Sequence, residues 1–335
     1  MTLQDIAKAA NTSVSTVSRV LAGGANARRI SVETRTRVAA AAEQLGYRPN
    51  LLARSLRTRR SHTVALLVSD ISNPFFGELG VCVERQLHKY GYSMILCNSG
   101  EDAALERDYL RLLPQKGIDG LIMVPVLSSA DELRRAVRGD MPVVVVDRPI
   151  AGLPAVVATD QTKLAERLCD ELATGGVKRV LLVAGPRDNV NHLMRADVIR
   201  RRFVVIGQHM GPVEVSTGQV AMQQFISAGL LTVDKTDAVV GTNNHLAMAA
   251  VQSLSGVAAL GKRVPVVGCV DALPLMDCLP VPLVCVKQDL EAMAERAVGL
   301  LMQELLGEES VGGVAHVGQL AITVSRNAAF EAGLK

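Results

Sequence analysis

The chain has 335 residues, of which 49% are hydrophobic and 21% charged, and this composition is typical of a globular protein with two or three compact units. No stretch approaches the roughly 18 apolar residues that predict a membrane span, and the N-terminus does not resemble a secretion signal, so we expect a cytoplasmic protein without a membrane partner. Residues 1–60 carry 11 Lys or Arg against 3 Asp or Glu (+8), whereas the remainder carries 25 against 30 (−5), which predicts that a basic head meets a polyanion.

Three segments of the basic head have apolar residues at helical spacing. Residues 2–10 and 14–23 predict two short helices joined by a tight turn with Ser13 as an N-cap, which is a helix-turn-helix candidate. A third helix is expected over residues 31–47, capped by Ser31. The apolar residues expected to form the core of the head are Leu3, Ile6, Ala7, Ala10, Val14, Val17, Val20, Leu21, Val32, Val38, Ala41, Ala42 and Leu45.

In a helix-turn-helix protein the second helix enters the major groove of DNA. Ser15, Thr16 and Arg19 point away from the apolar stripe of that helix, so they are the predicted base readers. The alternative from the pattern alone is a three-helix module that binds protein.

The stretch YRPNLLARSLRTRRSH, residues 47–62, places three leucines among five arginines and one histidine. Pro49 and Asn50 indicate a helix start, but two helical turns are too short to be stable alone in water. We therefore expect residues 50–57 to be unordered without DNA and to fold on binding it.

The rest of the chain alternates strand-like apolar runs with helical segments. The expected strands are residues 63–69, 93–97, 120–126 and 142–147, followed by 179–185, 238–241, 265–270 and 283–288. This alternation predicts two α/β units with parallel sheets, in which ligands bind beyond the carboxyl ends of the strands.

Polar and aromatic side chains follow several of these expected strands. Asp147 and Arg148 end one strand and Asp271 ends another. Carboxylates and guanidinium groups can bind the hydroxyls of a sugar, and a phenyl face can cover its apolar side. For each residue the alternative is a capping or interlobe structural role. The remaining candidates are Asn73, Phe75 and Phe76 near Asp70, then Asp160, and then Asn189, Asn191 and Arg195.

Taken in order, the fragments TLQDIAKAANTSVSTVSRVLAG, TVALLVSDISNPFF, GYSMILCNSGED, IDGLIMVPV, VVVVDRP, VVATDQ, RVLLVAGP and VVGCVDALPL resemble the lac/galactose repressor family of bacterial transcription regulators. The resemblance implies a helix-turn-helix headpiece over residues 1–46, a hinge helix and linker over 47–60, and a two-lobed, periplasmic-binding-protein-like body over 61–335. Its N-terminal lobe would comprise about 61–160 plus 290–318, and its C-terminal lobe about 161–289 plus 319–335.

The same resemblance implies a homodimeric, allosteric repressor of transcription that binds double-stranded operator DNA. A small effector, a sugar or sugar phosphate, would bind between the lobes, and Asp147, Arg148, Arg195 and Asp271 occupy effector-contact positions. Leu56 matches the family's wedge between base pairs, with Arg54, Arg57 and Arg59 beside phosphates.

Some positions depart from the family pattern. Val198 and Ile199 replace a Gly-aromatic pair, and Asn244 replaces a carboxylate. The short stretch between Arg195 and Glu214 resembles fructose-repressor-like members. These departures leave open an effector-blind body or one that responds to a protein partner.

The sequence does not predict an enzyme, because it holds no nucleophile elbow, phosphate-binding loop, dinucleotide fingerprint or zinc-protease motif. Six scattered cysteines without a Cys-x-x-Cys spacing favour free thiols, and we expect neither a metal nor a cofactor.

Overall fold

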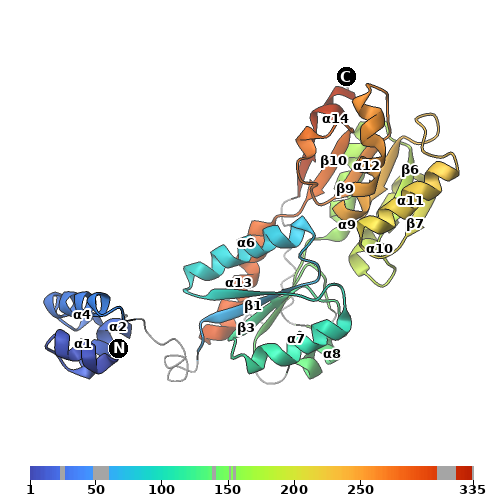
Figure 1. Ribbon diagram of the computed structural model, residues 1–335. Coiled ribbons are helices and arrows are strands. Elements are labelled where there is room, and N and C mark those ends of the chain that lie inside the picture. Colours follow the sequence, from blue (N-terminus) through green and yellow to red (C-terminus); the bar gives the residue numbers. More distant parts are fainter. Residues whose placement is uncertain are drawn as a thin grey trace. The chain divides into compact units, whose positions relative to one another are not determined.

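The structure is a computed structural model that describes residues 1–22, 27–47, 60–137, 141–150, 152–153, 156–307 and 322–333. The chain divides into two compact units, Met1–Ser61 and His62–Lys335 (Figure 1). No helix among the described residues is long and apolar enough to cross a membrane.

The first unit contains the helices α1 (Leu3–Ala9), α2 (Val14–Ala22) and α4 (Val32–Gln44). The expected caps are present, since Ser13 Oγ accepts from the Thr16 amide at 3.1 Å and Ser31 Oγ accepts from the Thr34 amide at 3.3 Å. The buried core consists of Ile6, Ala7, Ala10, Val17, Val38, Ala41 and Ala42.

Two of the predicted core positions in this unit are wrong. Val14 is 41% exposed and Val32 is 69% exposed. Both are the first residues of their helices, and a helical side chain leans toward the N-terminus, so these two lean past the end of the packed surface.

The second unit has two lobes, each built on one sheet. The N-terminal lobe has the strand order β2-β1-β3-β4-β5, and every pairing is parallel. The strands are β1 (Thr63–Val68), β2 (Ser93–Asn98), β3 (Gly120–Met123), β4 (Val143–Val146) and β5 (Val156–Val157). The helices of this lobe are α6 (Pro74–Lys89), α7 (Ala103–Gln115), α8 (Ala130–Ala136) and α13 (Leu290–Leu306).

The C-terminal lobe has the strand order β11-β10-β9-β8-β6-β7. Its pairings are parallel apart from that of β11 with β10, which is antiparallel. The strands are β6 (Arg179–Ala184), β7 (Val204–Met210), β8 (Ala238–Gly241), β9 (Val266–Val270), β10 (Leu283–Lys287) and β11 (Thr323–Arg326). The helices are α9 (Gln161–Thr174), α10 (Val190–Arg202), α11 (Val215–Ser227), α12 (Asn244–Ala259), the 3-10 turn η1 (Met276–Cys278) and α14 (Ala328–Gly333).

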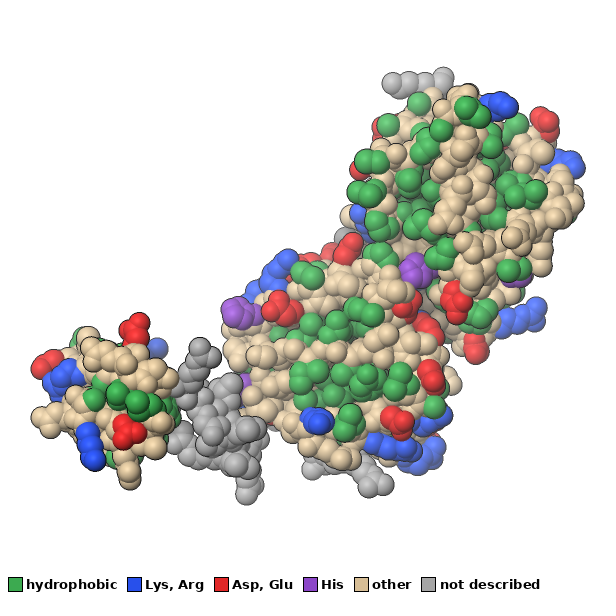
Figure 2. All heavy atoms as spheres, in the orientation of Figure 1, with side chains coloured by type: hydrophobic (Ala, Val, Ile, Leu, Met, Phe, Trp, Pro, Cys, Tyr) green, Lys and Arg blue, Asp and Glu red, His purple; other side chains and the backbone are tan. Residues whose placement is uncertain are grey.

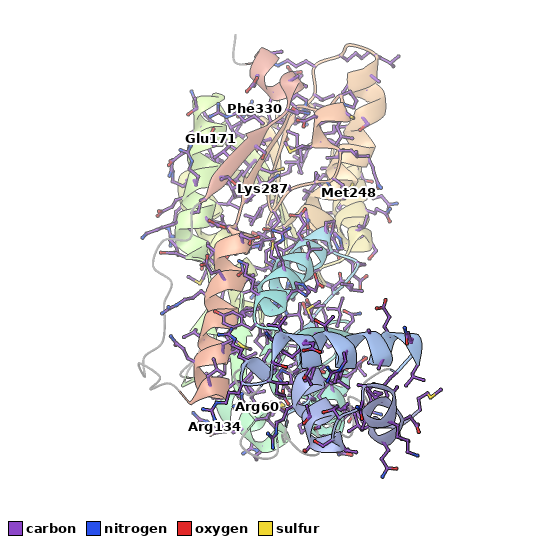
Figure 3. The ribbon with its side chains drawn as sticks, turned by 90° about the vertical axis from the view of Figure 1, so that its left-hand side faces the viewer. Arg60, Arg134, Glu171, Met248, Lys287 and Phe330 are labelled. Carbon is purple, nitrogen blue, oxygen red and sulfur yellow. The ribbon has the colours of Figure 1, made fainter. Side chains whose placement is uncertain are left out.

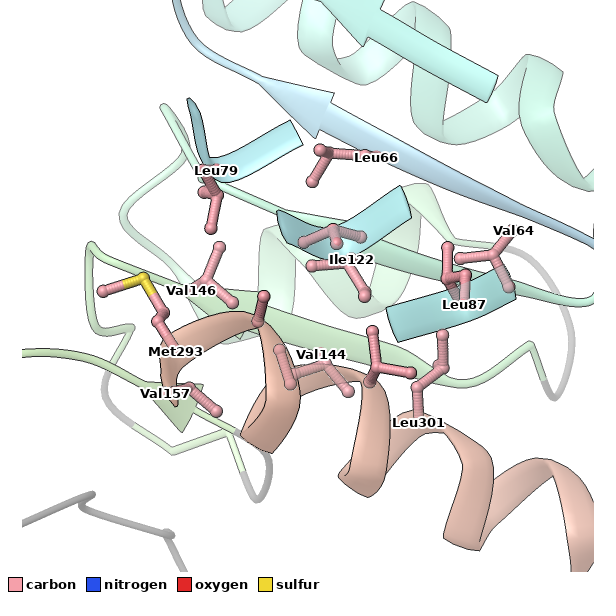
Figure 4. Packing of buried hydrophobic residues seen from close by; sticks show 14 of the residues in the cluster. Val64, Leu66, Leu79, Leu87, Ile122, Val144, Val146, Val157, Met293 and Leu301 are labelled. Atoms are coloured by element: carbon pink, nitrogen blue, oxygen red, sulfur yellow. The ribbon is translucent and has the colours of Figure 1, made fainter. Parts of the chain in front are cut away.

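The predicted two-lobed α/β body with parallel sheets is thus confirmed. In the N-terminal lobe, α13 returns from far along the sequence and packs beside α6 on the sheet, where Leu301 and Met293 meet Val144 and Val146 (Figure 4). Gly120 on β3 allows this close approach, because a Cβ there would lie 2.9 Å from a Leu301 methyl group. The chain therefore crosses between the lobes again to complete the first core.

Asn327, at the start of α14, holds the C-terminal end of the chain onto the second sheet. Its side-chain oxygen accepts from the amides of Leu283 (3.0 Å) and Phe330 (3.1 Å). Its amide nitrogen donates to the carbonyls of Met276 (3.2 Å), Leu279 (3.1 Å) and Val281 (2.8 Å). Asn327 is buried, and Phe330 one turn later enters the core of this lobe (Figure 3).

Candidate functional site

Asp147 and Asp271 each follow the last residue of a strand, β4 in one lobe and β9 in the other. Both have left-handed backbones, with φ of 64° and 65°, a conformation that costs a residue other than glycine free energy. Burial raises the pKa of both carboxyl groups, that of Asp271 to about 6, against the charge of Arg195. The two lobes therefore each present a strained, buried carboxyl group at a strand end.

Arg195 lies on α10 and is buried in the same place. Its Nε donates to Gln161 Oε1 at 2.8 Å and its Nη1 donates to the Thr242 carbonyl at 2.9 Å. Asp271 Oδ2 is 4.0 Å from Nη1, so carboxylate and guanidinium face each other across a gap that one hydroxyl could bridge. Gln288 Nε2 donates to the other Asp271 oxygen at 3.2 Å.

Arg148 is paired with a carboxylate of its own lobe. Its guanidinium donates through both terminal nitrogens to Glu101, at 2.7 Å from Nη1 to Oε2, and also to Ser69 Oγ at 3.2 Å. Although burial acts to raise it, the hydrogen bond and charge of Arg148 hold the pKa of Glu101 below its usual value.

His192, one turn before Arg195, is buried with Nδ1 2.7 Å from Thr242 Oγ1. Burial, together with the charges of Arg195 and Arg148, lowers the pKa of His192 well below its usual range, so the imidazole is neutral. Gly185 permits this packing, since a Cβ there would lie 2.4 Å from the imidazole ring.

Hydrogen bonds connect the two lobes across this region. Asn191 Nδ2 donates to the Asp147 carbonyl at 3.3 Å, and Asn244 Nδ2 donates to Asn73 Oδ1 at 3.1 Å. The cavity between them has a volume of only about 30 Å³, comparable with one water molecule and far below the roughly 300–1,000 Å³ of typical ligand sites. We name this space the interlobe cavity.

A second hollow of about 380 Å³ adjoins the interlobe cavity and shares Glu101, Arg148, Asn189 and Val213 with it. A larger hollow, about 800 Å³, lies elsewhere among the described residues, beside η1 and β11, and none of the predicted contacts lines it. The larger hollow and the predicted contacts therefore lie in different places. The convergence of charged groups favours the interlobe cavity as the binding site.

Nine of the ten predicted effector contacts line the interlobe cavity: Asn73, Phe75, Phe76, Asp147, Arg148, Asn189, Asn191, Arg195 and Asp271. Asp160 does not line it; its carboxylate caps α9 by accepting from the amides of Thr162 and Lys163 at 3.1 Å. Asp70, which also follows the first strand of the body as expected, lines the cavity too. The lining residues that were not predicted are Glu101, His192, Val213 and Asn243.

The structure accounts for two departures from the family pattern. Asn244 donates from its amide to Asn73 and to the Ala272 carbonyl, which a carboxylate could not do. Val198 and Ile199 are buried in the core of the C-terminal lobe, so they fill apolar space and do not shape the cavity.

The candidate base readers lie on α2 in the first unit. Ser15 and Arg19 are exposed, and Thr16 is half-buried. Ser13 Oγ lies 2.9 Å from Ser15 Oγ and 2.8 Å from Thr16 Oγ1, so these hydroxyls already form one polar group at the start of the helix. Arg54, Leu56, Arg57 and Arg59 lie outside the described residues, as does the rest of the predicted hinge helix.

The raised pKa of Asp271 predicts a pH dependence of folding. An aspartate whose pKa moves from about 3.9 in the unfolded chain to about 6 in the folded one binds its proton more tightly when folded. Its stabilising contribution is therefore greatest below about pH 4 and is lost as the pH rises through 6. Relative to Asp271→Asn, we expect the wild type to lose about 2 kcal/mol of unfolding free energy between about pH 4.5 and 7.5.

Urea denaturation of both proteins across this range measures the difference. The exposed Asp188→Asn, near the same cavity, is the matched control and should leave the wild-type profile unchanged. A constant difference between wild type and Asp271→Asn would contradict the assignment.

Two parallel-sheet lobes that face each other with charged strand ends define a binding-protein-like body, joined here to a helical head. Residues 61–263 match the family of periplasmic binding proteins and the sugar-binding domain of the LacI family, and residues 2–50 match the lacI family of bacterial regulatory proteins. The chain belongs to the lacI family, whose members are DNA-binding transcription regulators and not enzymes.

Among its relatives is a ribose operon repressor of Halalkalibacterium halodurans, 32% identical over 311 residues, which cover 91% of this chain and 90% of the relative. The lac repressor dimer bound to operator and an anti-inducer has a TM-score of 0.80 at 21% identity, covering 98% of this chain and 99% of that one. The Cra dual regulator of Pseudomonas putida with fructose 1-phosphate has a TM-score of 0.70 at 21% identity, over 79% and 98% of the two chains. At such identities the structural likeness establishes the fold alone, so the fructose-repressor-like subgroup stays a prediction.

Proposed function

We propose that this protein is a cytoplasmic, homodimeric repressor whose affinity for operator DNA is controlled by a small carbohydrate bound in the interlobe cavity. The observation that carries this proposal is the meeting of Asp147, Arg195 and Asp271, from both lobes, in one buried space. An effector that contacts both lobes shifts the equilibrium between two arrangements of the lobes only if it binds these arrangements with different affinities.

The head supplies the DNA side of the proposal. Its described residues include the helices α1, α2 and α4, and Ser15 and Arg19 are exposed on α2, as a recognition helix would require. Two heads on a symmetric dimer would read the two halves of a pseudo-palindrome. The proposed domain limits are 1–46 for the head, 47–60 for the hinge and 61–335 for the body.

The dimer contact is proposed to include the edge strand β2. Ile95 and Leu96 on this strand are exposed, as is Val81 on α6, although all three are apolar. Figure 2 shows a band of apolar side chains across this lobe. An exposed apolar edge strand invites pairing with another chain, and a second copy of the protein would cover it.

The main test is fluorescence anisotropy with DNA sites selected by the protein itself from a random pool. Titration with a sugar panel should change the affinity for the selected site by at least ten-fold for one member. If no member changes it and none binds in calorimetry, the body is effector-blind. A pull-down from lysate then tests for control by a protein partner.

For the DNA contacts, Leu56→Ala is expected to weaken operator binding and reduce DNA bending while leaving effector binding unchanged. Arg19→Ala should cost about 1–3 kcal/mol on the selected site and less on random DNA, because a base contact carries specificity. Anisotropy and gel-shift bending assays measure both effects. Unchanged bending by Leu56→Ala would remove the wedge role.

A further inference from the structure

The two guanidinium groups of the interlobe cavity already face carboxyl groups of the protein. Glu101 accepts from both terminal nitrogens of Arg148, whose side chain is only 13% exposed. Arg195 faces Asp271 and is further occupied by Gln161 and Thr242. A bidentate pair of this kind already provides the geometry by which arginine recognises phosphate or carboxylate ligands.

The charge balance of the interlobe cavity is negative. Its lining contains four carboxyl groups, Asp70, Glu101, Asp147 and Asp271, against Arg148 and Arg195, and His192 is neutral. Burial raises the pKa of Asp147, and without Asp147 the lining still holds three carboxyl groups against two guanidinium groups. The raised pKa of Asp271, about 6, lies below neutral pH. The adjoining hollow adds Asp188 and no further cation among its lining residues, and the small space behind Asp271 adds Glu78 and Lys287, one of each sign.

The buried atoms without a hydrogen-bond partner in this part of the body are mainly acceptors. Asp147 Oδ1, Asn191 Oδ1 and Gln288 Oε1 have no donor among the described residues. Gln161 Nε2 has no acceptor there, and Thr159 Oγ1, which could donate or accept, has no partner. A buried acceptor without a donor costs about 1–3 kcal/mol, so such atoms indicate what a ligand must provide. Sugar hydroxyls donate hydrogen bonds; an ionised phosphate ester accepts them.

We propose that the effector carries no phosphate or carboxylate, that it is an uncharged, hydroxyl-rich molecule, and that Glu101 is the residue that excludes anions. The inference rests on the proposed function, because it concerns the ligand of the interlobe cavity. Glu101 is well suited to the task, since its own amide donates to the Ser69 carbonyl at 2.8 Å and its backbone is left-handed, with φ of 57°. An anionic group could reach Arg148 only by displacing a carboxylate that the loop holds in place.

The experiment compares the full-length wild type, Glu101→Gln and a matched control, Glu132→Gln. Glu132 also accepts from an arginine, Arg107, at 2.7 Å in the same lobe, but it does not line the cavity. Each protein is titrated in calorimetry with inorganic phosphate, and with matched pairs of neutral sugar and phosphate ester: ribose and ribose 5-phosphate, fructose and fructose 1-phosphate, glucose and glucose 6-phosphate.

We expect one neutral sugar to bind the wild type and its ester to bind at least ten-fold more weakly. Glu101→Gln should bind inorganic phosphate or the ester at least ten-fold more tightly than wild type, and Glu132→Gln should match wild type. An ester that binds wild type more tightly than its parent sugar overturns the proposal, as does a Glu101→Gln protein with unchanged anion affinity. If neither sugars nor esters bind any of the three proteins, the carbohydrate effector itself is wrong, and the proposed function fails with it.

Discussion

Replacing Arg195 by methionine is expected to abolish the response of operator binding to effector and to destabilise the body by about 3–5 kcal/mol. Arg195 is buried, and its Nη1 lies 4.0 Å from Asp271 Oδ2. Its removal takes away the largest of the charges that oppose the effect of burial on the carboxyl groups of Asp147 and Asp271. It also leaves Gln161 Oε1 and the Thr242 carbonyl without their donor. Urea denaturation and anisotropy with the selected operator site measure the two effects.

The matched control for this change is Arg200→Met, on the same helix. Arg200 pairs with Asp197 at 2.6 Å, but both side chains are partly exposed, and such a pair contributes about 0–1 kcal/mol. Arg195→Lys should keep part of the stability and lose the effector response. Lysine lacks the planar guanidinium group that donates to Gln161 and Thr242 at the same time. A full effector response in Arg195→Met would show that the ligand binds elsewhere.

Replacing Asn327 by alanine is expected to cost about 3–5 kcal/mol of unfolding free energy, close to the largest effects of single substitutions. The change removes five hydrogen bonds at once and leaves the backbone groups of Leu283 and Val281 unsatisfied in the interior. Because α14 and the end of the chain are held through this side chain, we expect the C-terminal lobe to unfold first. Hydrogen exchange would show the loss of amide protection in β10 before a loss of protection in β1.

Two further substitutions separate this role from ordinary burial. Asn327→Asp keeps the accepting oxygen but turns a second oxygen toward three carbonyls, so it should be at least as damaging as alanine. Asn98→Ala removes a side chain that accepts one hydrogen bond, from the Ile71 amide, and should cost about 1 kcal/mol. Equal losses for Asn98→Ala and Asn327→Ala would contradict the proposed role of Asn327.

The strand-end rule explains why so much of the candidate site could be predicted. Asp147 and Asp271 follow apolar runs directly, and the carboxyl ends of parallel strands meet at one edge of each sheet, so sequence position alone brings them to the interlobe cavity. The same rule misplaced Asp160 relative to the cavity, because a residue after a strand is also the first place for a helix cap. Its carboxylate is used by α9.

What the sequence could not predict depends on contacts between distant segments. Glu101 stands in a Gly-Glu-Asp stretch that reads as an ordinary turn, and only the approach of Arg148, 47 residues later, gives it a role in the cavity. In the sequence, His192 looks like a residue on the surface of a helix. It is buried because Gly185 has no side chain and leaves room for the imidazole ring. The burial of Val14 and Val32 was overestimated for a related reason. Hydrophobic periodicity predicts which face of a helix is buried, but not how far along the helix the packed neighbour extends.

The small interlobe cavity also bears on the speed of regulation. A space of about 30 Å³, bridged by Asn73–Asn244 and Asp147–Asn191 hydrogen bonds, cannot admit a sugar unless the lobes first separate. Effector association should therefore reach a plateau at high concentration, set by the rate of lobe opening and not by diffusion. The time a cell needs to change transcription after the sugar appears would then be limited by an internal motion of the repressor, and weakening one bridging asparagine would shorten it.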